Sequence, residues 1–341
     1  MLTRVPDYFE QFRCLAGACP RSCCVGWEVV IDPDTAAAYR ALPGPFGDRL
    51  RAALRRDADG GDCFPLAGGR CPFLDREDLC EIHRRLGEAA TSATCRAHPR
   101  FIEEYGPFRE ISLAASCPAA ARLLLGSWAP LTFREAEAPG ETEPGDPWLG
   151  PLLAARGRMF RLLTDRTKPL RRRLADLLDL ALAAQDLLDE DRAEDLPALA
   201  ESFAPADGEP PAEGPGLFPG ALDLLGELEV LEPDWRELLS SARGIPTERA
   251  DEALLERTAA YFLFRHGLKA VNDGDLAGRI GLCLLGTLTA ERLAAACGLE
   301  DALERFSREI EHDQDNLDAL RAAFWEDERL SPARLWAELA R

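Results

Sequence analysis

The stretch that decides the organisation of this chain is FRCLAGACPRSCCVGW, residues 12–27, which carries the four cysteines Cys14, Cys19, Cys23 and Cys24. Nine of the eleven cysteines in the 341-residue chain lie between Cys14 and Cys117. Two glycines and a proline in the opening stretch predict a loop with turns rather than a helix. Several thiolates on one turn-rich segment, completed by cysteines from later segments, are typical of a zinc or iron–sulfur site.

Simpler explanations exist for single cysteines, but they do not account for the whole set. A lone cysteine is most often a small buried apolar residue, and we expect this role for Cys283 and Cys297 on apolar helical faces. Metal or cluster binding is favoured over thiol redox chemistry or chance for the nine N-terminal cysteines. Among these, Cys63 fits the metal hypothesis least well, because its surroundings are rich in glycine.

The type of metal is not determined by the spacing. The adjacent pair Cys23-Cys24 cannot easily direct both sulfurs at one tetrahedral ion, so it would serve a larger cluster or two sites. A purely thiolate ligand set favours an iron–sulfur cluster, with zinc as the alternative. We expect structural roles for the four histidines, which are His83, His98, His266 and His312.

Two arginines lie close to one of the candidate ligands. Arg96 and Arg100 both follow Cys95 closely in TCRAHPR. They could bind a carboxylate or stabilise the charge of a cluster through charge-assisted hydrogen bonds. The equally weighted alternative is an ion pair with one of the nearby glutamates, which are Glu103, Glu104 and Glu110.

The composition restricts the class of protein. A net charge of −20 argues against nucleic acid or an anionic membrane as a partner. Residues 1–125 carry 16 arginines and 17 acidic residues, so nearly all of the net charge belongs to the rest of the chain. The N-terminus does not resemble a signal peptide, and no uninterrupted apolar stretch is long enough for a membrane span. We therefore expect a cytoplasmic protein whose thiols stay reduced.

The pattern of the whole chain predicts a mainly α, α+β fold with a small Cys-rich metal-binding region on a larger helical body. We divide it into a cluster-binding region at residues 1–128, a linker or loop at 129–150, and a helical domain at 151–341. Apolar residues at helical spacing support the third part. Residues 204–220, rich in proline and glycine, predict a disordered loop within it.

Four local elements are expected in the Cys-rich part. A short strand should cover residues 27–31, followed by a helix with Asp34 as its N-cap. A small strand pair should surround Gly106-Pro107, and a helix should begin at Pro118. The dinucleotide-binding glycine motif, the P-loop, the serine elbow and the radical S-adenosylmethionine (SAM) cysteine motif are missing, which disfavours a doubly wound enzyme.

Three segments together resemble the flagellin lysine-N-methylase family. They are YFEQFRCLAGACPRSCCVGWEVVID, CPFLDREDLCEIHRRLGE and TCRAHPRFIEEYGPFREISLAASCPAAARLLL, and RFSREIEHDQDNLDAL is similar to the C-terminal part of that family. The likeness covers about the first 125 residues well and the last 90 loosely. The cysteine pattern alone is shared with a broader group of proteins that have zinc- or iron-chelating cysteine clusters.

The resemblance implies methyl transfer from SAM to lysines on the surface of flagellin or a similar protein, with an iron–sulfur cluster, most simply 4Fe-4S, in the enzyme. It carries over eight metal ligands, which are Cys14, Cys19, Cys23, Cys24, Cys71, Cys80, Cys95 and Cys117, and gives Cys63 no counterpart. Lysine methylation needs a neutral amine in line with the sulfonium methyl group. The sequence does not choose among four possible helpers, which are Tyr8, Asp32, Tyr39 and Glu110.

Two alternatives from other classes remain open at this point. The cysteines could belong to a non-enzymatic zinc- or iron-chelating protein, in which the metal serves structure, sensing or metal handling. They could also belong to a thiol redox protein that uses Cys23-Cys24. The acidic helical body suits a lysine-bearing protein partner, which it would attract in a salt-dependent way.

Overall fold

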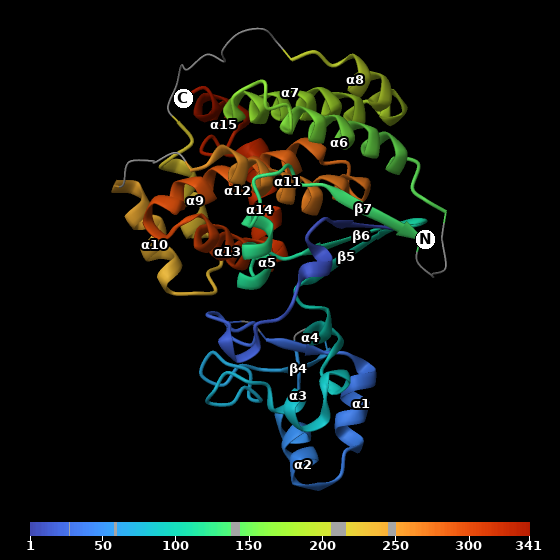
Figure 1. Ribbon diagram of the computed structural model, residues 1–341, viewed down its shortest axis with the longest axis vertical. Helices are drawn as coiled ribbons and strands as arrows, with labels where there is room; N and C mark the ends of the chain where they lie inside the picture. Colours follow the sequence, from blue (N-terminus) through green and yellow to red (C-terminus); the bar gives the residue numbers. More distant parts are fainter. Residues whose placement is uncertain (27, 58–59, 138–143, 206–215, 245–249) are drawn as a thin grey trace.

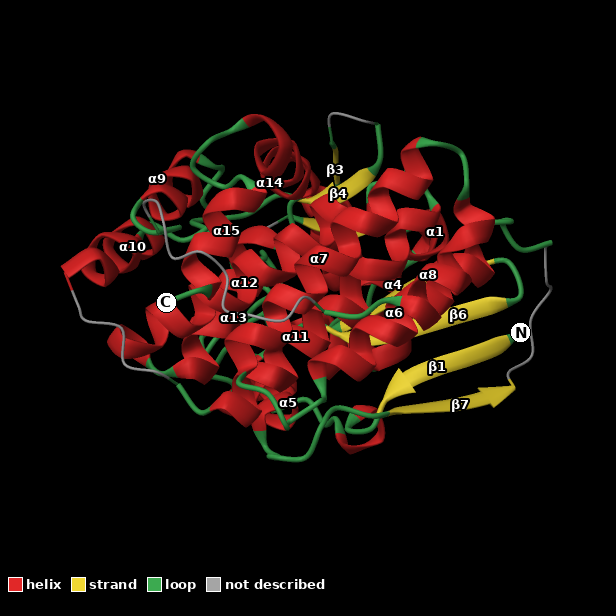
Figure 2. Cartoon of the chain, turned by 90° about the horizontal axis from the view of Figure 1, so that it is seen from above, coloured by secondary structure: helices red, strands yellow, loops and turns green. Residues whose placement is uncertain are grey.

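The computed structural model describes residues 1–26, 28–57, 60–137, 144–205, 216–244 and 250–341. Over this range the chain forms a small cap, which holds helices α1 to α4, beneath a larger body of helices (Figure 1). A four-stranded sheet lies along one side of the body (Figure 2). The prediction of a mainly helical α+β protein, with a small N-terminal part on a larger helical body, is confirmed.

The cap has its own short strands and its own apolar core. Its elements are β2 (Val29–Ile31), α1 (Pro33–Ala41), α2 (Gly44–Ala53), β3 (Arg55–Arg56), β4 (Asp62–Phe64), α3 (Glu81–Leu86) and α4 (Ala93–Ala97). The strands pair antiparallel in the order β2-β4-β3. In the core, the Tyr39 ring stacks on Phe64 at 5.8 Å between centroids, and Phe64 lies 4.8 Å from Phe73. These rings pack with aliphatic residues such as Ile31 and Leu50 in the core of this small unit.

The start of α1 differs from the sequence prediction by two residues. The helix begins at Pro33, and its N-cap is Asp32 rather than Asp34. The Asp32 carboxylate accepts a hydrogen bond from the Thr35 amide at 3.1 Å. Proline is favoured at the first helical position, which places the cap on the residue before it.

The larger sheet joins segments that are far apart in the sequence. Its strands are β1 (Leu2–Pro6), β5 (Arg100–Tyr105), β6 (Phe108–Leu113) and β7 (Phe133–Glu137), in the order β5-β6-β1-β7. The predicted strand pair around Gly106-Pro107 is confirmed by the β5–β6 hairpin, in which Gly106 takes a φ of 64°. Strand β1 runs parallel to β6 and antiparallel to β7, and neither β1 nor β7 was predicted.

The predicted linker and the predicted loop are only partly described. Strand β7 occupies residues 133–137 of the predicted linker at 129–150, whereas residues 138–143 lie outside the described residues. The predicted loop at 204–220 falls between two helices, and its residues 206–215 also lie outside the described residues. The division of the chain into three parts therefore stays a prediction.

The body is built from helices. They are α5 (Pro118–Leu125), α6 (Leu149–Leu163), α7 (Leu170–Asp189), α8 (Leu196–Ser202), α9 (Gly220–Glu227), α10 (Asp234–Gly244), α11 (Glu252–His266), α12 (Leu276–Cys297), α13 (Leu299–Ile310), α14 (Gln314–Glu326) and α15 (Pro332–Leu339). Helix α12 passes through the middle, and glycines on it allow neighbours to approach. A Cβ on Gly281 would lie 2.3 Å from the Phe324 ring, and one on Gly286 would lie 2.8 Å from Phe262. The predicted helix starting at Pro118 is confirmed.

Helix α12 is also, within the part of the chain that the structure describes, the one helix long and apolar enough to cross a membrane. Most of its apolar window, 72%, is buried inside the protein. Its residues pack against α7, α11, α13 and α14, as expected for the central helix of a core.

The large apolar core contains residues of the body helices and of two segments from the N-terminal part of the chain. Tyr8 and Phe12 from the N-terminal segment, and Tyr105 and Phe108 from the β5–β6 hairpin, belong to the same buried cluster as the body helices. The residues between them, from β2 to α3, supply the separate core of the cap. The cysteine segments therefore run along the boundary between the two cores.

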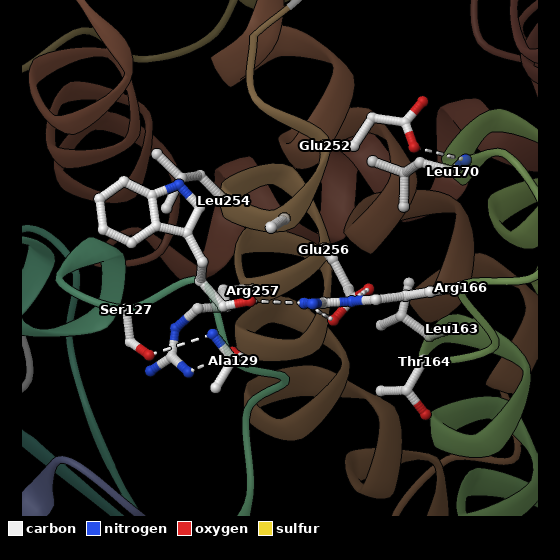
Figure 3. A network of polar contacts seen from close by, with 12 residues as sticks. Ser127, Ala129, Leu163, Thr164, Arg166, Leu170, Glu252, Leu254, Glu256 and Arg257 are labelled. Carbon is white, nitrogen blue, oxygen red and sulfur yellow. Dashed lines mark hydrogen bonds and ion pairs between the residues drawn. The ribbon is translucent and has the colours of Figure 1, made fainter.

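A buried ion network holds the body together near the end of α5 (Figure 3). Glu256 on α11 is fully buried and accepts two hydrogen bonds at 2.9 Å from Arg166 and one at 2.5 Å from Arg173. The adjacent Arg257 donates to the backbone oxygens of Leu124 and Ala129. Because an unpaired buried charge is costly, these contacts fix α11 against the α6–α7 connection and the segment after α5.

Candidate functional site

The first cysteine segment leads from the N-terminus into the cap. Cys14 precedes a single 3-10 turn, Ala16–Ala18, and its sulfur accepts a hydrogen bond from the Ala16 amide at 3.4 Å. Cys19 follows the turn, and its thiol donates to the Arg21 carbonyl at 3.0 Å. The predicted loop with turns is confirmed, and the sulfurs of Cys14 and Cys19 make local hydrogen bonds within it.

This segment is attached to helix α13 by buried and half-buried ion pairs. Arg21 contacts three carboxylates, at 3.0 Å from Glu232, 2.8 Å from Asp301 and 2.6 Å from Glu304. Arg308, which is 2% exposed, lies 2.8 Å from Glu232 and donates to the carbonyls of Ser22 and Val25, one on each side of the adjacent cysteine pair. The position of the cysteine pair is therefore set by α13.

A second set of cysteines comes from the cap itself. The Cys71 amide donates to the Cys24 carbonyl at 2.8 Å, and an isolated bridge joins Leu74 to Cys80. Cys80 is the N-cap of α3 and Cys95 lies in α4, so short helices carry both of these residues. Two backbone turns thereby bring Cys24, Cys71 and Cys80 to the same edge of the cap core.

Cys117 belongs to the body, at the N-cap position of α5, where it packs against the large core. The residues before it are tied to distant helices. The Ala115 amide donates to the Tyr261 hydroxyl at 3.0 Å, the Ser116 amide donates to the Ser307 hydroxyl at 2.9 Å, and the Ser116 hydroxyl lies 2.6 Å from His312 Nε2. Cys117 is therefore held rigidly on the body side of the boundary.

The thiols influence one another electrostatically, which shows that they are neighbours. The pKa of Cys71 is raised to about 11, chiefly by burial and to a smaller extent by the charges of Cys80, Cys95 and Cys23. Burial likewise raises the pKa of Cys95, and Cys80 and Cys23 add to the effect. A hydrogen bond between the adjacent thiols lowers the pKa of Cys23 to about 7 and raises that of Cys24. These five residues form one group.

The other three predicted ligands adjoin this group through Cys23. Burial raises the pKa of Cys19, and the charges of Cys23 and Cys14 raise it further. Burial raises the pKa of Cys117 to about 11, with added contributions from Cys19 and Cys23. The eight cysteines named from the resemblance therefore lie in the same part of the fold, where the charge of Cys23 affects thiols of both the cap and the body.

The remaining cysteines are placed differently. Cys63 is buried in β4, and the pKa of its thiol is raised by burial and by Glu28, Asp57 and Asp62, with no other cysteine among the causes. Cys283 is buried within α12, where burial raises the pKa of its thiol, and Cys297 ends the same helix. The expectation that Cys283 and Cys297 sit on apolar helical faces agrees with these positions.

The thiols lie near one another, but their sulfurs do not converge as the ligands of a bound metal do. Among the described residues, no three His, Cys, Asp or Glu side chains converge tightly enough to chelate an ion. The donor set itself suits a soft metal or an iron–sulfur cluster, because it consists of thiols. Ligation would require rotation of side chains around Cys23 and Cys24.

The arginines beside Cys95 do not form the ion pairs that the alternative prediction named. Arg96 donates to the backbone oxygens of Thr91 and Ala89, and the Arg100 guanidinium lies over the rings of Phe9 and Phe12. The three glutamates have other cationic partners, which are Lys269 and Arg265 for Glu103, Arg109 for Glu104, and Arg156 and Arg4 for Glu110. Among the described residues that alternative is therefore wrong, because Arg109 on the neighbouring strand pairs with Glu104, and cations from distant segments pair with Glu103 and Glu110.

The four suggested helpers are dispersed. Asp32 caps α1 and also accepts from the Ala93 amide at 2.7 Å, and the Tyr39 hydroxyl donates to the Ala90 carbonyl at 2.7 Å. Glu110 forms a buried ion pair with Arg156. Tyr8 is buried, and burial raises the pKa of its hydroxyl. Asp32 and Tyr39 lie near one another in the cap, where both contact residues 90–93 and the Asp32 charge raises the pKa of Tyr39, whereas Glu110 and Tyr8 contact the body.

Two half-buried histidines lie close together between the segment that follows Cys95 and the end of α13. The rings of His98, three residues after Cys95, and His312 lie 6.1 Å apart, and burial lowers the pKa of each to about 4. Next to His312, Glu311 accepts hydrogen bonds from His266 at 2.7 Å and from the Tyr261 hydroxyl at 2.6 Å. Both histidines are therefore neutral near pH 7.

The sequence reasoning missed the residues of α13 that hold the cysteine segment. Glu304 and Arg308 are four residues apart, on a helix whose charged residues also fall at buried positions. Burial raises the pKa of Glu304 to about 7, against the lowering effects of Arg21 and Arg308. Charges at positions where helical spacing requires an apolar face are the signal that could have identified this contact.

Comparison with known proteins finds relatives that match about a third of this chain. The flagellar biosynthetic protein FliU of Salmonella muenchen is 31% identical over 119 residues, which are 33% of this chain and 70% of FliU. Lysine-N-methylases of Salmonella typhimurium and Salmonella choleraesuis are also 31% identical over 119 residues, but this stretch covers only 30% of their length. No family model and no solved structure matches. The chain therefore belongs to a family of flagellin lysine-N-methylase-related proteins that includes FliU.

Proposed function

We propose that this protein is a SAM-dependent protein lysine N-methyltransferase that acts on flagellin or a similar lysine-bearing protein. The observation that carries the proposal is the 31% identity with two proteins named Lysine-N-methylase. The name of FliU adds a flagellar context for the substrate. We further propose that the protein works in the cytoplasm, where flagellin is made and SAM is available.

The proposed cofactor is an iron–sulfur cluster, most simply 4Fe-4S, held by thiolates of the cysteine group. A set of four, Cys24, Cys71, Cys80 and Cys95, is the best candidate, because backbone contacts and mutual charge effects link its members. Cys14, Cys19 and Cys117 lie on the body side and would ligate a second metal or serve structure. When bound, the cluster would cross-link the segments of the cap, as structural metal sites do.

The chain's own residues support a protein substrate in a simple way. The parts of the chain beyond residue 125 carry almost all of the net charge of −20. Such a surface raises the local concentration of a lysine-bearing partner and steers its approach. Methyl transfer then requires the ε-amine to lose its proton and to lie in line with the sulfonium methyl group.

The test combines metal analysis with methyl transfer. Protein purified without oxygen should contain about four irons and four sulfides per chain, and it should transfer labelled methyl groups from SAM to lysines of purified flagellin. Cys95→Ser should lose the metal, whereas Cys63→Ala, in the same cap but outside the thiol group, should keep it. SAM binding without methyl transfer to any lysine would disprove the proposed activity.

The second candidate function is a metal-chelating protein without enzymatic activity. It is favoured by the extent of the similarity, because the matched stretch covers only 30% of the length of the lysine-N-methylases. Zinc without sulfide, together with no binding of SAM, would support this candidate. Reversible formation of a disulfide in metal-free protein would instead support thiol redox chemistry at Cys23 and Cys24.

A further inference from the structure

A polar cavity of about 180 Å³ lies between β5, α11, α12 and α14. Its lining includes three cations, Lys269, Arg279 and Arg321, and a single carboxylate, Glu103. The rest of the wall includes uncharged polar groups such as Asn272. A concentration of cations is unusual in a chain with a net charge of −20.

The two arginines are held in place by carboxylates behind them. Arg279 uses Nε and Nη2 to contact Asp273, and Arg321 Nη1 contacts Asp273 at 2.7 Å and Asp275 at 3.0 Å. Arg321 Nη2 contacts Asp318 at 2.6 Å, and within the described part of the chain Arg279 Nη1 and Arg321 Nε take no part in these ion pairs. Fixed guanidinium groups with donors to spare suit a planar carboxylate, because little side-chain freedom is lost on binding.

A second group of charged residues surrounds Glu103, which lines the cavity. Lys269 lies 2.6 Å and Arg265 lies 3.0 Å from the same oxygen of Glu103, so two positive charges surround one negative charge. Burial lowers the pKa of His266 to about 4, so the imidazole in the wall is neutral near pH 7. The lining itself therefore holds three cations and one carboxylate, and Asp273, Asp275 and Asp318 balance the two arginines from behind.

We propose that this cavity binds the carboxylate of a small organic ligand of about amino-acid size, with Arg279 and Arg321 as its partners. Most drug-sized ligands need a pocket of ~300 Å³ or more, so the cavity holds a small acid or one end of a larger molecule. The two sources are a free carboxylic acid and the methionine part of SAM; the second source rests on the proposed function, whereas the carboxylate site does not.

The experiment is calorimetric titration of the purified full-length protein with S-adenosylhomocysteine, with L-methionine, and with L-methioninol, which lacks the carboxylate. At least one of the two acids should bind, and methioninol should not. Arg279→Gln and Arg321→Gln should each weaken the bound acid at least about tenfold, as expected for the loss of one charge-assisted contact. Arg192→Gln is the matched control, because Arg192 also pairs with two carboxylates but lies outside the cavity.

The outcomes separate this proposal from the proposed function. Binding of S-adenosylhomocysteine that is insensitive to both variants would overturn the cavity assignment and leave methyl transfer standing. Arginine-dependent binding of methionine, without binding of S-adenosylhomocysteine, would support the cavity and remove SAM as its ligand. No binding of either acid to the folded wild type, or equal binding of methioninol, would overturn the carboxylate site. Arg321→Lys, which keeps the charge, shows whether a lost signal comes from unfolding or from the lost guanidinium.

Discussion

Replacement of Arg308 by glutamine should both destabilise the protein and release the cysteine segment. Arg308 is 2% exposed, and it connects α13 to Glu232 at 2.8 Å and to the carbonyls of Ser22 and Val25. Breaking a buried charge pair by removing one partner typically costs about 3–5 kcal/mol, because the other partner stays buried. Glutamine can recover part of one hydrogen bond, so we expect a loss of about 3 kcal/mol in the free energy of unfolding.

The measurement has a global part and a local part. Urea unfolding followed by circular dichroism gives the change in free energy, and the rate of thiol modification in native buffer reports opening around Cys23 and Cys24. The matched control is Arg305→Gln on the same helix, because Arg305 is half-buried and pairs with Asp234 and Asp301, which are both more exposed than Glu232. The control should lose at most about 1 kcal/mol and leave thiol modification unchanged. If R308Q behaved like the control, the segment would not depend on α13.

Gly281→Ala should lower the free energy of unfolding by about 1–3 kcal/mol, because its Cβ would lie 2.3 Å from a buried aromatic ring; an unchanged urea midpoint would show that α12 and α14 separate easily. Burial keeps the pKa of His266, His98 and His312 near 4 in the folded protein, against 6.5 for the exposed group. The unfolded chain therefore binds more protons between about pH 6.5 and pH 4, and stability should fall as the pH falls through this window. His266→Gln should reduce the slope of stability against pH there, and an unaltered slope would contradict the neutral buried imidazole. Binding of flagellin should weaken as salt rises from about 50 to 500 mM, measured by surface plasmon resonance, and salt-independent affinity would rule out attraction by the acidic body.

The local sequence was sufficient for elements that depend on neighbouring residues. Helical spacing of apolar residues and proline in the first turn predicted α5 correctly, and glycine with proline predicted the β5–β6 turn. Strand β1 could not be found in this way, because its partners β6 and β7 lie more than 100 residues away in the sequence. Pairing across such a distance depends on the rest of the fold rather than on local preference.

The candidate site shows the same limit. Cysteine spacing selected a set of residues that the structure brings together, and the separate position of Cys63 agrees with its poor fit to the pattern. The roles of Arg96 and Arg100 were not predictable, because the glutamates nearby in the sequence are paired by residues from distant helices. The contact of Arg21 and Arg308 with the boundary between cap and body also required the folded structure.

The end of α13 gives a physical reason to consider the cysteine group and the cavity together. Glu311 and His312 are consecutive in the sequence, but their side chains contact different residues. Glu311 accepts from His266 in the cavity wall and from Tyr261, which in turn accepts from the Ala115 amide. His312 contacts Ser116, the residue before Cys117. A ligand that moves His266 must therefore act on the same turn of backbone that positions Cys117, because buried hydrogen-bonded groups cannot shift singly without losing partners.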